Sequence, residues 1–323
     1  MLTFFTDPYE SELLYGAIGR YHYYIGNKDY KDTIREIFVN ENVIPTLGLA
    51  SYLDNVSNNL GSKYTSNYII KNHTIFPFYS PFLPENRKIE LIDNMKYSDG
   101  KGIYHKIGII AGSVCKKQGI YYCPECAKND IDKYGEVYIR RDHQLQGVFL
   151  CKNNGVKLKK YKINKTNTSR LEFIKLDEKL LDLKVEYEED EDISEKLISV
   201  SRCASYILNT NLDTFNKDII NKKYRQILHT KNLLSINNRI RQEELYDELI
   251  SFYGDKFLEL MESSIDKNDE YNWLKVITRN SNRVVHPIRH ILFINFLVEN
   301  IEVFLRQRNL IILIHLENLL GHA

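Results

Sequence analysis

The stretch Tyr121-Tyr-Cys-Pro-Glu-Cys126, together with Cys151 further along the chain, decides how the rest of the sequence is interpreted. A Cys-x-x-Cys pair places two thiols on one tight turn, and a third thiol after short strands resembles most of a zinc ribbon. A β-module of ~40 residues buries too little surface to be stable alone, so a bound metal would stabilise its fold directly. The sequence therefore predicts a Zn²⁺ site on Cys123, Cys126 and Cys151.

A tetrahedral structural zinc site has four ligands, and the identity of the fourth is open. Asn154 stands where a Cys-x-x-His pair would place its histidine. His143 is the nearest substitute and is the expected fourth ligand, whereas His105 is more remote. The alternative is a degenerate site without metal, or three cysteines that are buried as small apolar side chains.

The pattern around the cysteines changes from helical to extended and back to helical. Short strands are expected at Val137–Arg141, Gly147–Cys151 and Leu158–Ile163. Upstream, apolar spacing predicts helices over Glu10–Tyr24, Asp29–Val39 and Leu47–Leu60. Short helices joined by short turns fit a helix-turn-helix, and fit equally any small helical domain.

The segment His73–Pro84 contains three prolines and several aromatic residues. Proline lacks a backbone donor and forces extended backbone before it, so we expect an ordered apolar connection and no helix. Downstream of an acidic run, periodicity predicts six further helices: Ile193–Leu208, Lys222–His229, Glu243–Phe252, Asp255–Met261, Trp273–Arg279 and Pro287–Leu305.

The expected fold is mainly α with a small zinc-ribbon-like β module. The predicted domains are an N-terminal helical, helix-turn-helix-like domain over 1–115, the zinc module over 116–165, a charged linker over 166–195 and a C-terminal helical, helix-turn-helix-like domain over 196–323.

Composition limits the classes of protein that the chain can represent. Of 323 residues, 43% are hydrophobic and the net charge is +1, which suits a globular protein and not a globally basic one. Five cysteines are too few for a disulfide scaffold. The sequence shows neither a membrane-spanning apolar run nor a secretory signal over Met1–Pro8, so we expect a cytoplasmic protein without a membrane partner.

Charge is segregated locally into a basic stretch and an acidic stretch. The lysines are Lys152, Lys157, Lys159, Lys160, Lys162 and Lys165, and the acidic residues are Glu186, Glu188, Glu189, Asp190, Glu191 and Asp192. One interpretation is a solvated loop followed by a charged linker. The other is a local patch that contacts phosphates.

Motifs for enzymatic chemistry are missing from the sequence. It contains no Gly-x-x-x-x-Gly-Lys phosphate loop, no His-Glu-x-x-His and no Gly-x-Ser-x-Gly. Asp130, Asp132, Glu136 and Asp142 could be imagined as a metal-dependent nuclease site, but their irregular spacing around Arg140 and Arg141 suits salt bridges better. We therefore predict a protein that is not an enzyme.

Several strings in the chain resemble those of the TnsD/TniQ family of transposon target-selection proteins, and they occur in the family's order. They are Tyr9-Glu-Ser-Glu-Leu-Leu-Tyr15, Ile18-Gly-Arg20, Thr46-Leu-Gly-Leu49, His73–Phe82, Tyr122-Cys-Pro-Glu-Cys126, Tyr134-Gly-Glu136, Arg141-Asp-His-Gln-Leu145, Gly147, Cys151, Tyr253-Gly-Asp-Lys-Phe-Leu258, Asn272-Trp-Leu274 and His286-Pro-Ile-Arg-His290. The chain departs from the family at Asn154, where the usual zinc pattern ends in histidine, and it stops earlier than TnsD-type proteins usually do.

The resemblance implies a target-selection adaptor in bacterial transposition. Such a protein binds double-stranded target DNA and recruits a TnsC-type AAA+ ATPase, which in turn calls in the transposase. The alternative is a zinc-containing transcriptional regulator that binds DNA as a homodimer without an ATPase.

The DNA-contacting surface is expected on a helix-turn-helix over Trp273–Leu297, where arginine and asparagine suit base edges and lysine suits phosphates. Its candidate DNA-binding residues are Lys275, Arg279, Asn280, Arg283, Arg289 and His290. The alternatives are an ordinary solvated helical face at this place, and the lysine stretch as a second DNA-binding candidate.

Overall fold

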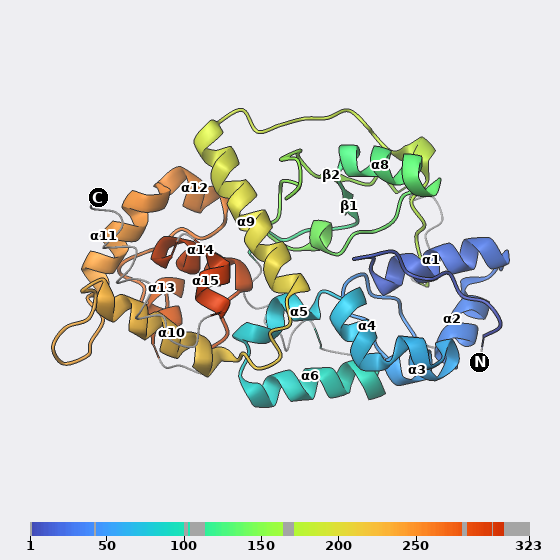
Figure 1. Cartoon of the computed structure of the whole chain (residues 1–323), viewed down its shortest axis with the longest axis horizontal. Helices are drawn as coiled ribbons and strands as arrows, with labels where there is room; N and C mark the ends of the chain where they lie inside the picture. Colours follow the sequence, from blue (N-terminus) through green and yellow to red (C-terminus); the bar gives the residue numbers. More distant parts are fainter. Residues whose placement is uncertain are drawn as a thin grey trace. The chain divides into compact units, whose positions relative to one another are not determined.

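A computed structural model describes residues 2–41, 43–99, 103, 114–163, 171–279, 283–298 and 300–306. The fold is mostly helical and has one two-stranded sheet, as predicted (Figure 1). Two compact units divide the chain. The first comprises Met1–Phe78, Asn86–Ile107 and Lys116–Asn211, and the second comprises Tyr79–Glu85, Gly108–Cys115 and Leu212–Ala323.

Three helices of the N-terminal third overlap the predicted segments, and three more occur between Ser66 and Tyr97, where no helix was predicted. They are α1 (Leu14–Ile25), α2 (Tyr30–Phe38), α3 (Leu53–Leu60), α4 (Ser66–His73), α5 (Phe76–Tyr79) and α6 (Glu85–Tyr97), with 3₁₀ turns η1 (Ser62–Tyr64) and η2 (Ser80–Phe82). Asp29 caps α2 by accepting a hydrogen bond from the backbone N–H of Lys31. Gly26 ends α1 at φ +73°, a conformation that costs glycine little.

The prediction that His73–Pro84 contains no helix is wrong. The end of α4, the short helix α5 and the turn η2 occupy this segment. Pro77 and Pro81 stand in the first turns of α5 and η2, where a helix N–H has no intrahelical partner and its loss costs nothing. The expected apolar burial holds, since Phe78 and Phe82 are buried.

The central segment differs from a zinc ribbon. Strand β1 (Tyr121–Tyr122) pairs antiparallel with β2 (Lys159–Lys160), which lies within one of the predicted strands. The predicted strands Val137–Arg141 and Gly147–Cys151 are wrong, because each contributes a single bridge, Arg140 to Glu12 and Leu150 to Lys157. The Cys-x-x-Cys pair opens a helix, α8 (Pro124–Tyr134).

A side chain takes the place of the missing strand. Gln144, in the 3₁₀ turn η3 (Asp142–Gln144), accepts from Tyr121 N at 2.9 Å and donates to Tyr121 O at 2.8 Å. The same amide donates to Arg140 O at 2.9 Å. Backbone groups that a ribbon would pair in a ladder are therefore satisfied by one glutamine.

A buried ion network joins α1 to the central segment inside the first unit. Glu12 is 0% exposed and receives two hydrogen bonds from the Arg20 guanidinium, at 3.0 and 2.8 Å. Arg20 also donates to Glu136 at 3.0 Å, and the Tyr9 hydroxyl donates to the same Glu136 oxygen. Burial raises the pKa of Glu12 to about 6, while the hydrogen bonds from Arg20 act in the opposite direction. The network thus holds residues before α1, within α1 and after α8 together inside one compact unit.

The described part of the expected linker is packed against the first unit. Phe173 is buried and its ring lies 5.2 Å from that of Tyr15, whose hydroxyl donates to Glu172 O at 3.0 Å. We call the described segment 171–190 the strap. It contains the 3₁₀ turn η5 (Glu178–Leu180) and leads into α9 (Glu191–Asn209), whose N-terminus Asp190 caps. The described residues of this segment thus contact the rest of the first unit at Tyr15.

Two lysines of the basic stretch pair with the acidic run, Lys157 with Glu188 and Lys159 with Glu186 at 3.2 Å, and further pairs use carboxylates outside that run. Lys159 Nζ lies 2.7 Å from an Asp182 carboxylate oxygen, and Lys157 Nζ lies 2.9 Å from Glu188. Lys152 pairs with Asp142 at 3.1 Å. Lys165 lies outside the described residues. These pairings favour the interpretation as a solvated face over the interpretation as a phosphate patch.

The second unit is built from helices around α14. The helices are α10 (Lys217–Thr230), α11 (Gln242–Tyr253), α12 (Asp255–Leu260), α13 (Trp273–Thr278), α14 (Pro287–Leu297) and α15 (Ile301–Arg306). The single helix predicted over Pro287–Leu305 is two helices, because Val298 is extended and Asn300 accepts a hydrogen bond from Glu302 N. No described helix combines the length and apolar character that a membrane crossing requires.

Replacing Arg20 by methionine tests the buried network. The change leaves Glu12 buried without its cation, whereas Glu136 keeps Lys175 Nζ at 3.3 Å, so we expect a loss of about 3–5 kcal/mol in the free energy of unfolding, measured by urea titration of the full chain. The control is Arg35→Met in α2, which breaks the solvent-exposed pairs with Asp32 and Glu41 and should leave the unfolding midpoint in place. Equal effects of the two substitutions would contradict the assignment.

Candidate metal centre and nucleic-acid surface

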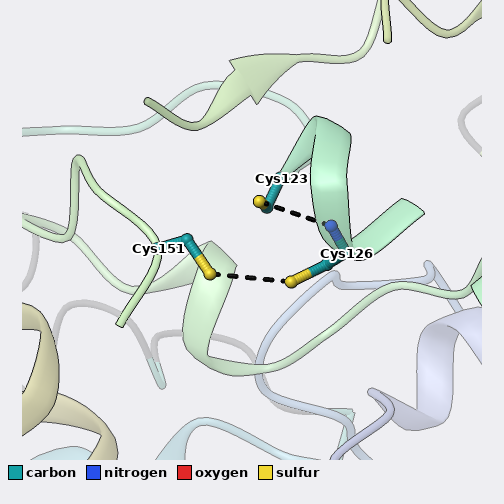
Figure 2. Close-up of side chains that lie close together, drawn as sticks. All are labelled: Cys123, Cys126 and Cys151. Atoms are coloured by element: carbon teal, nitrogen blue, oxygen red, sulfur yellow. Dashed lines mark hydrogen bonds between the residues drawn. The ribbon is translucent and has the colours of Figure 1, made fainter. Parts of the chain in front are cut away.

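Three thiols converge in the first unit. Cys123 occupies the N-cap of α8, Cys126 lies in its first turn, and Cys151 approaches from the segment after Leu150 (Figure 2). The three Sγ atoms lie within 4.8 Å of one another, and Cys126 Sγ is 3.6 Å from Cys151 Sγ. The prediction that these cysteines form one group is confirmed.

The backbone around the thiols holds them in place. Cys123 Sγ accepts a hydrogen bond from Cys126 N at 3.5 Å, so the helix N-terminus favours negative charge on this sulfur. Cys151 N donates to Val156 O, and Gly155 N donates to Cys151 O, both at 2.8 Å. Gly155 closes this turn at φ +71°. The side chains of Val156 and Leu158 pack against the sulfurs and shield them from water.

The thiols influence one another's protonation. The pKa of Cys123 is lowered because the thiols of Cys126 and Cys151 donate hydrogen bonds to its sulfur. The pKa values of Cys126 and Cys151 are raised, since each shares its proton with Cys123 and both are buried. The thiolate form is therefore favoured at Cys123 over the other two cysteines. A divalent cation would displace the remaining protons.

The donor set fits a tetrahedral thiolate-bound metal ion. A metal–sulfur distance of about 2.3 Å in a tetrahedron corresponds to about 3.8 Å between sulfurs, close to the separation of Cys126 and Cys151. The Asn154 side chain lies 3.6 Å from Cys123 Sγ and turns back to accept from Val156 N at 3.2 Å.

His143 is placed apart from the thiols. The group of metal-ligating side chains in the described residues contains the three cysteines and not His143. His143 is buried, which lowers its pKa to about 4, and its backbone oxygen accepts from Lys117 Nζ at 2.7 Å. His105 lies outside the described residues. Asn154 is therefore the polar side chain that stands beside the three sulfurs.

The carboxylates considered for a nuclease are used as salt-bridge partners. Asp130 pairs with Arg140 at 2.6 Å, and Asp142 pairs with Lys152. Glu136 belongs to the Arg20 network, whereas Asp132 is exposed. Within the described part of the chain these groups do not gather into a metal-binding cluster.

The expected DNA-reading helix is a core helix. Nine of the eleven residues of α14 are buried. His290 is 2% exposed, stacks on Phe82 with ring centroids 4.2 Å apart, and its Nδ1 lies 2.8 Å from the Tyr224 hydroxyl. The assignment of His290 to DNA contact is therefore corrected to a packing role.

The other candidates on this segment have protein partners. Arg289 is half-buried and donates to Glu262 O at 3.0 Å. Lys275 and Arg279 both face Glu270, at 3.5 and 3.1 Å. Arg283 is exposed, and its guanidinium lies 3.9 Å from the Tyr271 ring centroid. Asn280 lies outside the described residues. Of the described candidates, Arg279 and Arg283 reach solvent.

Sequence reasoning missed a concave basic surface next to Arg279. A cleft of about 880 Å³ lies between α10, the loop before α11 and the end of α13. We call it the cationic cleft, and its basic lining residues are Lys222, Arg225, Arg239 and Arg279. The four cations come from three separate segments, so no charge run in the sequence reveals them. The Asn237–Asn238 pair, which is typical of a turn, was the available signal.

Removing one thiol tests the metal centre. Protein purified without added metal should contain about one equivalent of a thiophilic metal by elemental analysis, and Cys126→Ser should lose it together with part of its thermal stability. Cys203→Ser is the matched control, because Cys203 is also buried but stands in α9 outside the thiol group. Less than about one-tenth of an equivalent in the unmodified protein would contradict a metal site.

Comparison with known proteins agrees with this architecture. The TniQ family model matches residues 3–158, and the model for Tn7-like transposition protein D matches residues 200–310. Transposon Tn7 transposition protein TnsD of Escherichia coli is 26% identical over 294 residues, covering 88% of this chain and 56% of that protein. The chain thus spans little more than half the length of this relative. Two family matches in succession, and a likeness along most of the chain, show that it is a member of the TnsD/TniQ family.

Proposed function

We propose that this chain is a target-selection adaptor in DNA transposition. It binds double-stranded target DNA and recruits a TnsC-type AAA+ ATPase, through which the transposase arrives. The observation that carries this proposal is the order of the family matches: the TniQ match covers most of the first unit, and the TnsD match covers α10 to α15. The adaptor acts by binding, and its carboxylates serve in ion pairs that stabilise the fold.

We further propose that the metal ion is Zn²⁺ in a structural role. Three buried thiolates suit a soft ion without redox chemistry, and a shielded site leaves little room for substrate. Cys123, Cys126 and Cys151 would hold the ion, with Asn154 beside the remaining position. The ion would fix the N-terminus of α8 to the turn after Cys151.

The adaptor function is tested by a pull-down. We expect immobilised full-length chain to retain the ATP-loaded TnsC-type ATPase encoded by the same element, and to retain more of it when duplex target DNA is present. The ADP-loaded ATPase is the control for nucleotide dependence. Failure to retain the ATPase in either condition, with or without DNA, would refute the adaptor and leave a DNA-binding regulator as the better description.

Substitution at Asn154 tests the zinc assignment. Asn154→His restores the histidine of the family pattern at a position that already faces Cys123 Sγ, so we expect zinc to be released to a chelator more slowly than from the unmodified protein. The matched control is Asn153→His, at the exposed neighbouring position, which should leave the release rate unchanged. Equal release from both variants would show that residue 154 does not approach the ion.

A further inference from the structure

The connection between α10 and α11 is a defined hairpin that projects away from both helices (Figure 1). Leu234 bridges to Ile240, and Ser235 N donates to Arg239 O at 2.7 Å. The turn closes through Asn238, which is left-handed at φ +57°, a conformation that asparagine tolerates. Arg225 of α10 donates to Asn238 O at 3.0 Å and fixes the hairpin to the helix.

The tip of this hairpin carries an unusual set of exposed side chains. Ile236 is fully exposed (105%), more so than any other large hydrophobic residue in the described part of the chain. Asn237, Asn238 and Arg239 beside it are also exposed. A single exposed apolar side chain is common at protein surfaces, so Ile236 points to a partner only together with the polar and cationic side chains around it.

The cationic cleft lies at the base of the hairpin and carries excess positive charge. Asp218 is the one carboxylate among its described lining residues, against four cations. Lys222 and Arg239 are exposed and form no ion pair within the described segments. In a chain with a net charge of +1, this local excess is specific to one surface. It favours a polyanion with repeated charges.

Duplex DNA fits the two features together. Phosphates along one strand would meet the cleft. The minor groove, about 6 Å wide, is read by arginine and asparagine side chains and is opened by inserted apolar wedges. An isolated phosphate ligand would use the cations but leave Ile236 unexplained. An acidic protein surface would likewise have no use for a turn rich in asparagine.

We propose that the hairpin tip and the cationic cleft form a DNA-binding edge of the second unit. Lys222 and Arg225 contact phosphates, while Ile236 and Arg239 enter the minor groove. The inference rests on the proposed function for the presence of DNA. It moves the contact from α14, which is buried, to a wing between α10 and α11.

The test measures binding of fluorescent duplexes to the full-length chain over a range of salt concentrations. One duplex carries the element's target site and the other an unrelated sequence of equal length. Lys222→Gln combined with Arg239→Gln should weaken binding to both duplexes roughly ten-fold, and should lower the slope of log affinity against log salt by about 1, because only Lys222 of the pair contacts a phosphate. Ile236→Ser should weaken binding with the slope unchanged, because an apolar contact releases no counterions.

The matched control removes two positive charges elsewhere in the second unit. Lys256→Gln combined with Lys267→Gln changes the net charge equally, and neither residue lines the cleft. This variant should keep the affinity of the unmodified protein. Circular dichroism melting of each variant establishes that it is folded, which is expected because the substituted side chains are exposed or lie at the surface.

The outcomes separate this inference from the adaptor function. Affinities and salt slopes that match those of the unmodified protein in the cleft and hairpin variants would overturn the DNA-binding edge. So would retained DNA affinity with lost ATPase recruitment, since the surface would then dock a protein. Weakened DNA binding by these variants, in a chain that never recruits the ATPase, would support the edge and refute the adaptor alone. An unmodified protein that binds neither duplex at low salt would overturn both.

Discussion

The burial of the Glu12 carboxylate is the constraint on which the first unit depends. A carboxylate with no exposed surface is strongly destabilising unless a cation reaches it, and Arg20 from the next helix supplies that cation. The same guanidinium extends to Glu136, which stands just after α8. The angle at which α1 meets the central segment is therefore set by hydrogen-bond geometry as much as by apolar packing. The glutamate, arginine and second glutamate all fall within the family-like strings, which gives those strings a structural explanation.

The three cysteines stabilise the central segment of the same unit. The central segment has one two-residue strand pair and a short helix, too little regular structure to order itself by burial. The cysteines tie the start of α8 to the turn after Cys151, and Gln144 satisfies backbone groups that a longer sheet would have paired. The strap that contains Phe173 then closes over α1. These local contacts take the place of a sheet core. The central segment is therefore a part of the first unit and not a separate zinc ribbon.

The residues that could be predicted from sequence are those whose role follows from local spacing. Apolar periodicity located α1 to α3 and the helices from α9 onward, although not α4, α5, α6 or α8, and the Cys-x-x-Cys pair with Cys151 located the thiols. The strand predictions at Val137–Arg141 and Gly147–Cys151 were wrong because these segments pair only through single bridges and with the Gln144 side chain. Sequence spacing does not encode such partners. The prediction that α14 contacts DNA was wrong because the type of a residue does not tell whether its side chain is buried. His290 looks polar in sequence, yet it stacks on Phe82, a residue from a remote part of the chain.

The charged surfaces of the protein could not be predicted from the sequence either. In the folded chain Lys157 and Lys159 pair with Glu188 and Glu186 of the acidic run, and Lys159 also pairs with Asp182, so part of the charge of the lysine stretch is neutralised. The cations of the cleft are scattered along the sequence, and the fold brings four of them together beside one lining carboxylate, Asp218, with Arg279 also paired to Glu270. A nearly neutral chain can therefore present a basic surface only if its acidic residues are committed elsewhere. In this protein many carboxylates are used in ion pairs of the first unit, and cations are in local excess at the cationic cleft of the second unit.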